Sequence, residues 1–484
     1  MSVLKNLQPE KVMYYFQELS SIPRASKNEK EISNWLLNWA KNKKFSVIQD
    51  EFLNIIIKKP ATKGYESVPT LIIQGHMDMV CEKNGNISHD FDKEGIKLQI
   101  QGDLIKGTGT TLGADNGIAV AFALALLDSE LPHPALEVLI TSDEEMGMTG
   151  ALNLNGSLLS GKLMINLDTE EEGEIYVSCA GGARGELEIP VHWDILPELS
   201  PGYLLKIRGL QGGHSGADIH EQRANANKLL GRILKELSTH MNYSVGHICG
   251  GAKDNAIPRE AEASLWIKKD DAEKLQYLVK EMETIFKDEY RVSDSEVRLE
   301  LEKIILSKIM DRDSFKKVLD TLVLHPNGIN TWSLDISGLV ESSLNLGVIV
   351  QKENSILLKS AIRGSVESRK FEIIDELEAL SDLTGSKFIH NSHYPAWKYN
   401  PNSKLRDAFV EIYKNITGKP AGIKAIHAGL ECGVLSEKIP GVDIISFGPN
   451  IRGAHTPEES VSITSIQNTW NYFIKGVESL KNYY

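Results

Sequence analysis

Short apolar runs that end in an acidic residue or a histidine are the feature that most restricts how this chain can fold. LIIQG runs into His76-Met77-Asp78, LEVLITS into Asp143-Glu144-Glu145, and KLMINL into Asp168. Such runs, alternating with helical segments, are typical of buried strands in an α/β sheet that helices cover on both faces. The carboxyl ends of these strands face a common crevice, where ligands bind. The pattern therefore predicts an α/β fold in which these polar side chains converge.

Two further polar residues fit the same arrangement, although they lie far apart in the sequence. Asp115, in GTTLGADNG, precedes the helix predicted for GIAVAFALALL, and His455 follows DIISFGPNIRGA. A single acid after a strand is usually a turn residue or a helix cap. Several such groups gathered without partners would be costly to bury, and divalent cations would neutralise them. Carboxylates with imidazole suit zinc, manganese or cobalt, and the absence of cysteine from the set argues against a closed structural zinc site.

Spacing within these motifs predicts distinct roles for neighbouring residues. On an extended chain His76 and Asp78 point to the same side, so the carboxylate can orient a metal-bound imidazole and raise its basicity. Glu144 and Glu145 are adjacent, and adjacent residues of a strand point apart. One of this pair is therefore expected to bind metal while the other acts on water as a general base. Elsewhere, SKNE at the start of the helix predicted over 26–43 has the spacing of a capping box.

Length and composition exclude several classes of protein. A chain of 484 residues is too long for one ordinary core, which predicts two domains. A formal net charge of -13 argues against a nucleic-acid partner. No apolar run approaches the roughly 20 residues of a membrane helix, so no membrane association is expected. The chain has no CxxC pair and its first residues form no signal-peptide run, which predicts reduced thiols in a cytoplasmic protein.

The pattern of apolar residues along the sequence changes near residue 183 and changes back near residue 397. Short apolar strands occupy residues 1–182 and 398–484, whereas residues 183–397 contain longer amphipathic alternations. Two segments in the middle, beginning at EASLWIKK and KSAIRGS, share a pattern of strand, charged turn and helix. We therefore expect a discontinuous α/β domain into which a second domain is inserted.

Seven motifs together resemble those of a known enzyme family: HMDMV, GADNG, TSDEEMG, INLDTEEEG, GGHSG, NAIPRE and GAHTPEE. They are similar to the motifs of the di-zinc metallopeptidases related to carboxypeptidase G and peptidase T. Within that group, LDTEEEGE, GGHSGADIH and HAGLECG most resemble bacterial aminoacyl-histidine dipeptidases. The resemblance covers nearly the whole chain. It implies a zinc-peptidase-like catalytic α/β domain, an inserted α+β lid domain that also mediates dimerisation, and a homodimer.

The resemblance assigns the convergent residues to a dinuclear centre. It implies that two Zn²⁺ ions per chain, replaceable by Co²⁺ or Mn²⁺, are bound by five residues: His76, Asp115, Glu145, Asp168 and His455. Asp115 would bridge the ions, and the peptide bond after it would be cis. Glu144 would be the general base acting on the bridging metal-bound water, and Asp78 would orient His76.

The resemblance also implies contacts with substrate outside the metal centre. His214 would stabilise the oxyanion, reaching the active site of the partner subunit. Asn255 and Arg363 would bind the substrate carboxylate, with Arg369 as a competitor of Arg363, and Glu431 would bind the substrate amino group. Ordinary structural roles compete with each of these: a turn histidine, a solvated charge, or an acid at the start of a helix.

The function expected from these residues is metal-dependent hydrolysis of dipeptides, preferentially Xaa-His, including β-alanyl-histidine (carnosine). The alternative is a related di-zinc exopeptidase or deacylase, such as a tripeptide aminopeptidase or an N-acyl amino acid deacylase, because the metal centre acts on the amide and not on the side chains. A hypothesis of a different class is a binding or assembly protein that kept the fold without activity. Such a protein would normally have lost ligands, and no ligand position is missing from this sequence.

Overall fold

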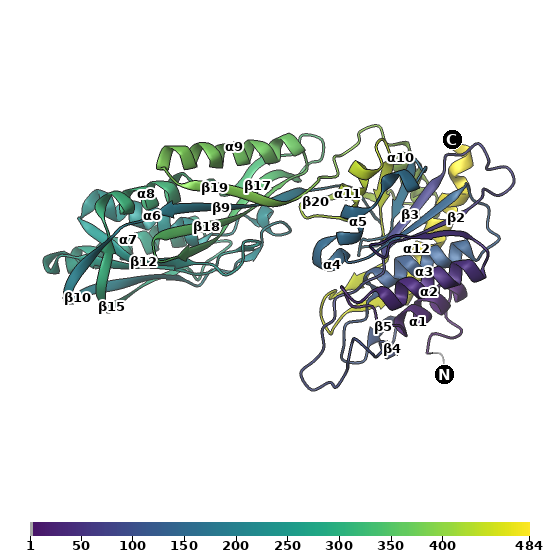
Figure 1. The fold of residues 1–484 in the computed structure, drawn as a ribbon, viewed down its shortest axis with the longest axis horizontal. Coiled ribbons are helices and arrows are strands. Elements are labelled where there is room, and N and C mark those ends of the chain that lie inside the picture. The colour runs from purple at the N-terminus through teal and green to yellow at the C-terminus, as the bar shows by residue number, and fades with distance from the viewer. Residues whose placement is uncertain (1–2) are drawn as a thin grey trace. The chain divides into compact units, whose positions relative to one another are not determined.

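A computed structural model describes residues 3–484, apart from the side chains of residues 198 and 199, and the chain divides into two compact units (Figure 1). Unit 1 comprises the residues up to Ser178 together with Tyr399–Ala425 and Leu430–Tyr484. Unit 2 comprises Cys179–Lys398 and Ile426–Gly429. The predicted α/β class is confirmed, since both units combine sheets with helices.

Unit 1 is built on an eight-stranded sheet with parallel, buried strands at its centre. In spatial order the strands are β1 (Ser46–Gln49), β2 (Ile55–Lys59), β6 (Leu136–Thr141), β3 (Leu71–His76), β7 (Leu163–Asn166), β21 (Asp443–Ser446), β8 (Glu174–Cys179) and β20 (Gly422–Ile426). β3 pairs in parallel with β6 and β7, and β7 pairs in parallel with β21. Every residue of β3, β6 and β7 is buried, as the continuous apolar runs predict.

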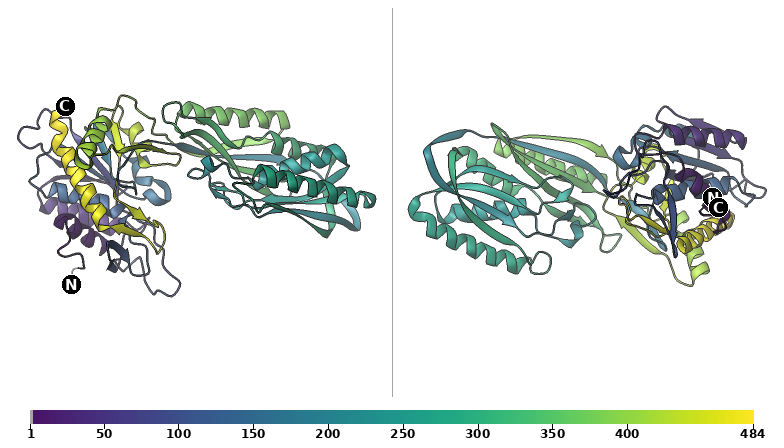
Figure 2. Two further views of the ribbon diagram at one scale, coloured as in Figure 1. Left: turned by 180° about the vertical axis from the view of Figure 1, so that it is seen from behind. Right: turned by 90° about the horizontal axis from the view of Figure 1, so that it is seen from below.

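Helices cover the sheet of unit 1 (Figures 1 and 2). They are α1 (Glu10–Ser20), α2 (Lys30–Asn42), α3 (Ala114–Leu127), α4 (Glu144–Gly147), α5 (Thr149–Asn153), α10 (Lys404–Thr417), α11 (Glu431–Lys438) and α12 (Ile463–Ser479). α3 packs against α1 and β3 and is buried almost all round, as expected for its apolar sequence. The predicted capping box is wrong: α2 begins at Lys30, and the Ser26 hydroxyl donates to Asp78 instead (2.8 Å). A tertiary contact uses the hydroxyl that a local cap would have used.

A smaller four-stranded antiparallel sheet of unit 1 supports two segments that carry site residues. It consists of β22 (Ile451–Arg452), β23 (Ser460–Ser462), β5 (Leu104–Gly107) and β4 (Leu98–Gln101). The turn between β22 and β23 contains His455, and β5 leads into the loop that reaches Asp115. Because β23 pairs with β5, these two segments start from neighbouring strands.

Unit 2 is built on a nine-stranded antiparallel sheet. In spatial order its strands are β15 (Arg298–Met310), β10 (Trp193–Arg208), β14 (Ala261–Ile267), β12 (Tyr243–Gly250), β17 (Val340–Gln351), β18 (Ser355–Gly364), β9 (Gly181–Pro190) and β19 (Lys387–Tyr394), while β16 (Gly328–Trp332) pairs with β17. The helices packed against it are α6 (Ala226–His240), α7 (Ala272–Glu289), α8 (Arg312–Leu324) and α9 (Glu367–Thr384). A separate pair is formed by β11 (Gly213–His214) and β13 (Ala256–Ile257).

The two predicted segments of strand, turn and helix are present in unit 2 as β14–α7 and β18–α9. β14 and β15 both pair antiparallel with β10, so they run parallel to each other with β10 between them. In the same way β18 and β19 flank β9. Each segment therefore forms a βαβ unit with one strand inserted between its two parallel strands, which explains the shared sequence pattern.

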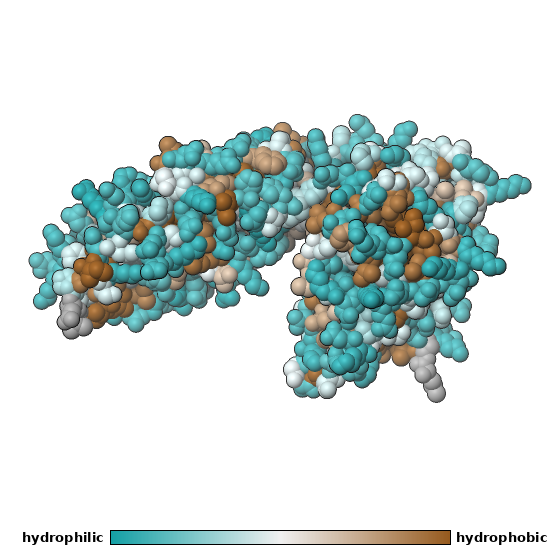
Figure 3. Space-filling view, viewed as in Figure 1, coloured by the Kyte–Doolittle hydropathy of each residue, from teal (hydrophilic) through white to brown (hydrophobic). Residues whose placement is uncertain are grey.

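Apolar side chains are concentrated in the cores of the units. The main cluster of unit 2, for example, joins its sheet to α6, α7 and α8. Figure 3 shows hydrophilic residues over most of the visible surface, with apolar residues in small scattered groups. Among the helices of residues 3–484, none is long and apolar enough to cross a membrane.

Candidate active site

His76 is the last residue of β3, and in the parallel register it stands beside Thr141, the last residue of β6. Its side chain is almost fully buried. Nε2 lies 3.2 Å from Asp115 Oδ1 and 3.5 Å from Asp168 Oδ1. Nδ1 lies 3.3 Å from Asp78 Oδ1. One ring nitrogen therefore faces two acids, and the other faces a third.

Asp115, in the first turn of α3, directs its two oxygens towards different histidines. Oδ1 faces His76, and Oδ2 lies 3.3 Å from His455 Nε2. The same nitrogen of His455 lies 2.9 Å from Glu145 Oε2. The Asp115–Asn116 peptide bond is cis, as the resemblance implies. Asp115 thus connects two groups of donor atoms.

The donor atoms of these groups fit a pair of divalent cations. Within each group they lie within 4.8 Å of one another, the first group being His76, Asp115 and Asp168 and the second Asp115, Glu145 and His455. In a tetrahedral site with bonds of about 2.0–2.1 Å, neighbouring donors are roughly 3.3–3.4 Å apart. The distances of 3.2 and 3.5 Å from His76, and of 3.3 Å from His455 to Asp115, are close to this spacing. Oxygen and imidazole donors of this kind suit zinc, cobalt or manganese.

The acids around His76 and His455 stabilise a positive charge at these two histidines. Burial alone would lower the pKa of His76, but Asp168, Asp115 and Asp78 outweigh it and hold that pKa well above its usual value. Hydrogen bonds with Asp115 and Glu145 raise the pKa of His455 to about 11. A histidine must give up its proton on the coordinating nitrogen to bind a cation, so metal binding here is coupled to proton release.

Glu144 and Glu145 form the first turn of α4 and are not on a strand, so the predicted reason for their different roles is wrong. An oxygen of each lies within 4.8 Å of the other and of a nitrogen of His76, so both carboxylates face the cluster. They differ in their partners, because only Glu145 pairs with His455. Burial and neighbouring acids such as Asp168 raise the pKa of Glu144 well above its usual value. A raised pKa suits a carboxylate that must accept a proton from water near neutral pH.

Asp78 connects His76 to the helix that carries Glu144. Its Oδ1 accepts from the backbone N–H of Glu144 (3.1 Å), and its Oδ2 accepts from the N–H of Glu145 (3.3 Å) and from Ser26 Oγ (2.8 Å). Burial would raise the pKa of Asp78, but the hydrogen bonds with His76 and Ser26 lower it. The carboxylate therefore stays charged and fixes both the imidazole ring and the start of α4.

Glu459 is a residue of this region whose role the sequence did not predict. Its carboxylate is buried and accepts four backbone N–H groups, those of residues 112–115, at 2.7–3.3 Å. It thereby fastens the loop that ends in Asp115 to the segment that carries His455. The only sequence signal is the paired acid of GAHTPEE, and nothing in that motif distinguishes Glu459 from the exposed Glu458.

Glu431 is the first residue of α11 and is fully buried. Its Oε2 accepts from Gln74 Nε2 and Thr141 Oγ1, both at 2.6 Å. Its Oε1 has no hydrogen-bond partner among the residues that the structure describes. Burial raises the pKa of Glu431 to about 7. One oxygen of this carboxylate is therefore available to a further donor.

His214 lies in unit 2, in β11, and its ring is held in one tautomer. Nδ1 accepts from the backbone N–H groups of Gly216 (3.2 Å) and Ala217 (3.0 Å), so the neutral ring carries its proton on Nε2. Burial and the charge of Arg363 lower the pKa of His214, which favours the neutral form. The ring can therefore donate one hydrogen bond from Nε2.

Asn255 lies beside the turn that follows His214. Its backbone carbonyl accepts from the N–H of Ser215 (2.9 Å), and the next residue, Ala256, pairs with His214. The structure therefore brings Asn255 close to His214, on two neighbouring segments of unit 2.

Arg363 and Arg369 lie in very different surroundings. Arg363, on β18, is buried; its Nη1 donates to Tyr394 Oη (2.9 Å), and its Nη2 lies 3.5 Å from His214 Nε2. Because the His214 and Arg363 nitrogens are both donors, an anion placed between them would accept from both. Arg369, on α9, is 45% exposed and pairs with Glu372 at 2.8 Å. Unit 2 thus brings Arg363 and His214 together and leaves Arg369 in a surface ion pair.

Known proteins resemble this chain over nearly its whole length. The model of peptidase family M20/M25/M40 matches residues 72–479. The cytosol non-specific dipeptidase of Escherichia coli (strain K12) is 38% identical over 475 residues, which cover 97% of each chain. The crystal structure of an aminoacylhistidine dipeptidase from Vibrio alginolyticus matches with a TM-score of 0.94, at 36% identity and over 98% of each chain. An aminopeptidase from Bacillus cereus, with a TM-score of 0.57 and 16% identity over 98% of this chain and 99% of its own, shares the fold.

Proposed function

Because this chain belongs to peptidase family M20/M25/M40, a family of metal-dependent peptidases, we propose that it is a dipeptidase with a dinuclear metal centre in unit 1. The observation that carries the proposal is the position of Asp115, whose two oxygens face different histidines. We assign two ions, Zn²⁺ with Co²⁺ or Mn²⁺ as substitutes, to five ligands: His76, Asp115, Glu145, Asp168 and His455.

In the proposed mechanism Glu144 is the general base. Divalent cations held by these ligands would polarise the peptide carbonyl and lower the pKa of water in the site. Glu144 accepts the proton of the attacking water and returns it to the leaving amine. Its raised pKa and the anchoring of its backbone N–H by Asp78 support this role. Asp78 in turn keeps the His76 ring in the orientation that metal binding needs.

The remaining candidates are proposed to bind the substrate. His214 donates from Nε2 to the oxyanion that forms at the attacked carbonyl. Arg363, with Asn255, binds the substrate carboxylate, because a buried guanidinium with an unpaired Nε among the described residues offers strong charge-assisted hydrogen bonds. The available Oε1 of Glu431 accepts from the substrate amino group.

We further propose that residues 1–182 and 398–484 form the catalytic domain and that residues 183–397 form a lid domain that mediates homodimerisation. His214 would then act in the active site of the partner subunit. The name of the Escherichia coli relative supports a cytosolic location for this chain as well.

For the substrate we propose Xaa-His dipeptides, including β-alanyl-histidine. The subfamily motifs and the name of the Vibrio relative support this preference. The name of the Escherichia coli relative supports a second candidate, a dipeptidase that accepts many sequences. Rates on β-Ala-His, Gly-His, Gly-Leu, Gly-Gly-Gly and N-acetyl amino acids separate them. Faster hydrolysis of both histidine dipeptides favours the first candidate, equal rates on all dipeptides favour the second, and turnover of only the tripeptide or the N-acetyl compounds contradicts both.

Two adjacent substitutions test the mechanism. Glu144→Gln should keep the metal content of the wild type and lose about 10²- to 10⁴-fold in kcat, because only proton transfer is removed. Glu145→Gln is the matched control, since it should lower the metal content as well. Metal analysis and kinetics on the same preparations give both readouts. Wild-type turnover by Glu144→Gln, or loss of metal from that variant, would contradict the assignment.

A further inference from the structure

Unit 2 contains a second cluster of metal-binding side chains, formed by His247, Cys249 and Glu262. His247 and Cys249 belong to β12, and Glu262 belongs to β14, where it stands directly opposite Cys249 in the antiparallel register. Donor atoms of the three residues lie within 4.8 Å of one another. The proposed peptidase mechanism uses none of them.

A β-bulge turns His247 and Cys249 to the face on which Glu262 lies. The register between β12 and β14 shifts between Val245 and His247. As a result Val245 and Ile248, which are three residues apart, both face the core, and His247 and Cys249 lie on the opposite, partly exposed face. The residues on either side of Glu262 also face the core, so its side chain emerges on that same face.

The donor atoms of the cluster are accessible to an ion. Cys249 Sγ lies 3.8 Å from Glu262 Oε1, and Glu262 Oε2 accepts from Arg208 Nη2 (2.8 Å). Glu262 thus uses one oxygen for the ion pair with Arg208 and turns the other towards the thiol. Among the described residues no hydrogen bond engages the ring of His247.

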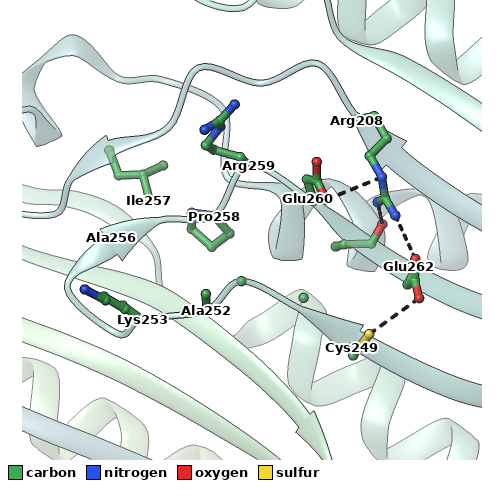
Figure 4. A pocket seen from close by; sticks show the side chains of 13 residues that line it. Arg208, Cys249, Ala252, Lys253, Ala256, Ile257, Pro258, Arg259, Glu260 and Glu262 are labelled. Atoms are coloured by element: carbon green, nitrogen blue, oxygen red, sulfur yellow. Dashed lines mark hydrogen bonds and ion pairs between the residues drawn. The ribbon is translucent and has the colours of Figure 1, made fainter. Parts of the chain in front are cut away.

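Cys249 and Glu262 line a cavity of about 620 Å³, together with the acid Glu260 and three basic residues, Arg208, Lys253 and Arg259 (Figure 4). Arg208 lies between two acids, with Nη2 2.8 Å from Glu262 and Nε 3.5 Å from Glu260. With Cys249 as a thiolate, this residue and the two acids carry three negative charges. Arg208 pairs with both acids, which leaves the thiolate and Oε1 of Glu262 as the anionic donors that face a bound cation.

We propose that this cluster binds one thiophilic divalent cation, such as Zn²⁺ or Cd²⁺, through Cys249, His247 and Glu262. Thiolate and imidazole donors select such ions over Mg²⁺ and Ca²⁺. The thiol proton of Cys249 is released to solvent as the sulfur–metal bond forms. Three protein ligands leave one position open for water or for a small ligand in the cavity.

Protection of the Cys249 thiol from alkylation tests the proposal. The full-length protein, first loaded with its catalytic metal, is titrated with Zn²⁺ and treated with iodoacetamide, and the alkylation of each cysteine is followed by peptide mass spectrometry. Zn²⁺ should slow the alkylation of Cys249 by at least about tenfold, while Cys81 in the same digest serves as the internal control. With Cd²⁺ the same titration should produce a thiolate-to-metal charge-transfer band. A Cys249 that alkylates equally fast with and without Zn²⁺ would overturn the proposal.

Two pairs of variants separate metal binding from unspecific effects. His247→Gln should raise the Zn²⁺ concentration needed for protection by at least about tenfold, whereas His240→Gln, at an exposed histidine of α6, should not. Glu262→Gln should weaken protection and Glu260→Gln should not, although both acids pair with Arg208. Equal effects of the two members in either pair would overturn the assignment of His247 or Glu262 as a ligand.

Discussion

The two clusters for which we propose metal binding, the dinuclear centre of unit 1 and the His247–Cys249–Glu262 cluster of unit 2, are held by the protein in very different ways. In unit 1 the residues around the donors are fixed in turn: Asp78 holds His76, and Glu459 holds the loop of Asp115. In unit 2 the donor side chains project from two strands. Glu262 is fixed by its ion pair with Arg208. A supported set of ligands gives a precise and tightly bound centre, as catalysis requires. A set with less support can still bind a soft ion, which then exchanges more readily.

Two histidines from each unit show the same contrast. In unit 1 neighbouring carboxylates raise the pKa of His76 and of His455. In unit 2 burial lowers the pKa of His325 to about 4 and that of His427 to about 3. The first pair is prepared for a positive charge, and the second pair serves as neutral hydrogen-bonding groups. The surrounding charges, and not the residue type, therefore decide which histidines can hold a cation in a carboxylate-rich site.

The largest effect is expected when the support of the unit 1 cluster is removed. Glu459→Ala leaves four backbone N–H groups, three of them buried, without their acceptor. At about 1–3 kcal/mol for each unsatisfied group, the free energy of unfolding should fall by about 4 kcal/mol or more, and metal affinity should fall with it. Chemical denaturation and metal titration measure the two effects.

The neighbouring acid provides the control for this variant. Glu458 is 74% exposed and pairs with Lys106, so Glu458→Ala should leave both quantities almost unchanged. If Glu459→Ala binds its metals as tightly as Glu458→Ala does, the support of Asp115 by Glu459 has no part in metal binding.

A smaller effect is expected for the two arginines of unit 2. Arg363→Lys should lower kcat/KM for dipeptides by about 10- to 100-fold, mainly through KM, because a buried bidentate donor is replaced by a point charge. Arg369→Lys, at a surface ion pair, should change kcat/KM by less than about twofold. Steady-state kinetics with one dipeptide measure both, and equal KM values for the two variants would remove Arg363 from the substrate site.

The smallest effect concerns the response of unit 2 to acid. The pKa of His325 falls from 6.5 in the unfolded chain to about 4 in the folded protein. The neutral His325 ring therefore makes its full contribution to stability above pH 6.5. This contribution is lost as the pH falls from 6.5 through 4, because in this range the unfolded chain binds a proton and the folded protein does not. At pH 5 the loss amounts to about 2 kcal/mol.

Hydrogen exchange of the amides of α8 at neutral pH and at pH 5 measures this loss. His325→Asn should reduce the pH dependence of protection, and His240→Asn, at an exposed site, should leave it as in the wild type. An unchanged pH dependence in His325→Asn would contradict the role of this histidine.

The convergence of the site residues could be predicted because it follows from general rules of α/β sheets. His76 ends one central parallel strand and Asp168 follows another, so their meeting required no knowledge of loop geometry. The local structure of Glu144 and Glu145 could not be predicted, since a four-residue helix gives too weak a signal against a strand. The capping box failed for a related reason: the hydroxyl of Ser26 found a stronger acceptor in the charged carboxylate of Asp78.

The cluster of unit 2 could not be predicted from the sequence, for a different reason. His247 and Cys249 have the spacing of residues on one strand face, but Val245 shares that spacing and is buried in the core. Only the shift of register after Val245 separates them, and the glycine at position 246 is its sole sequence signal. The pairing of Cys249 with Glu262 depends on the register between strands, which no local pattern determines.

The metal content of two variants tests directly whether Asp115 joins two metal sites. Asp115→Asn and Asp168→Asn are prepared in a His247→Gln background, so that the cluster of unit 2 does not contribute, and bound Zn²⁺ is counted by elemental analysis after dialysis. Asp115 faces both histidines, whereas Asp168 faces His76 alone, so Asp115→Asn should lose both ions and Asp168→Asn should lose one. Loss of the same number of ions from the two variants, or full retention by Asp115→Asn, would contradict the account.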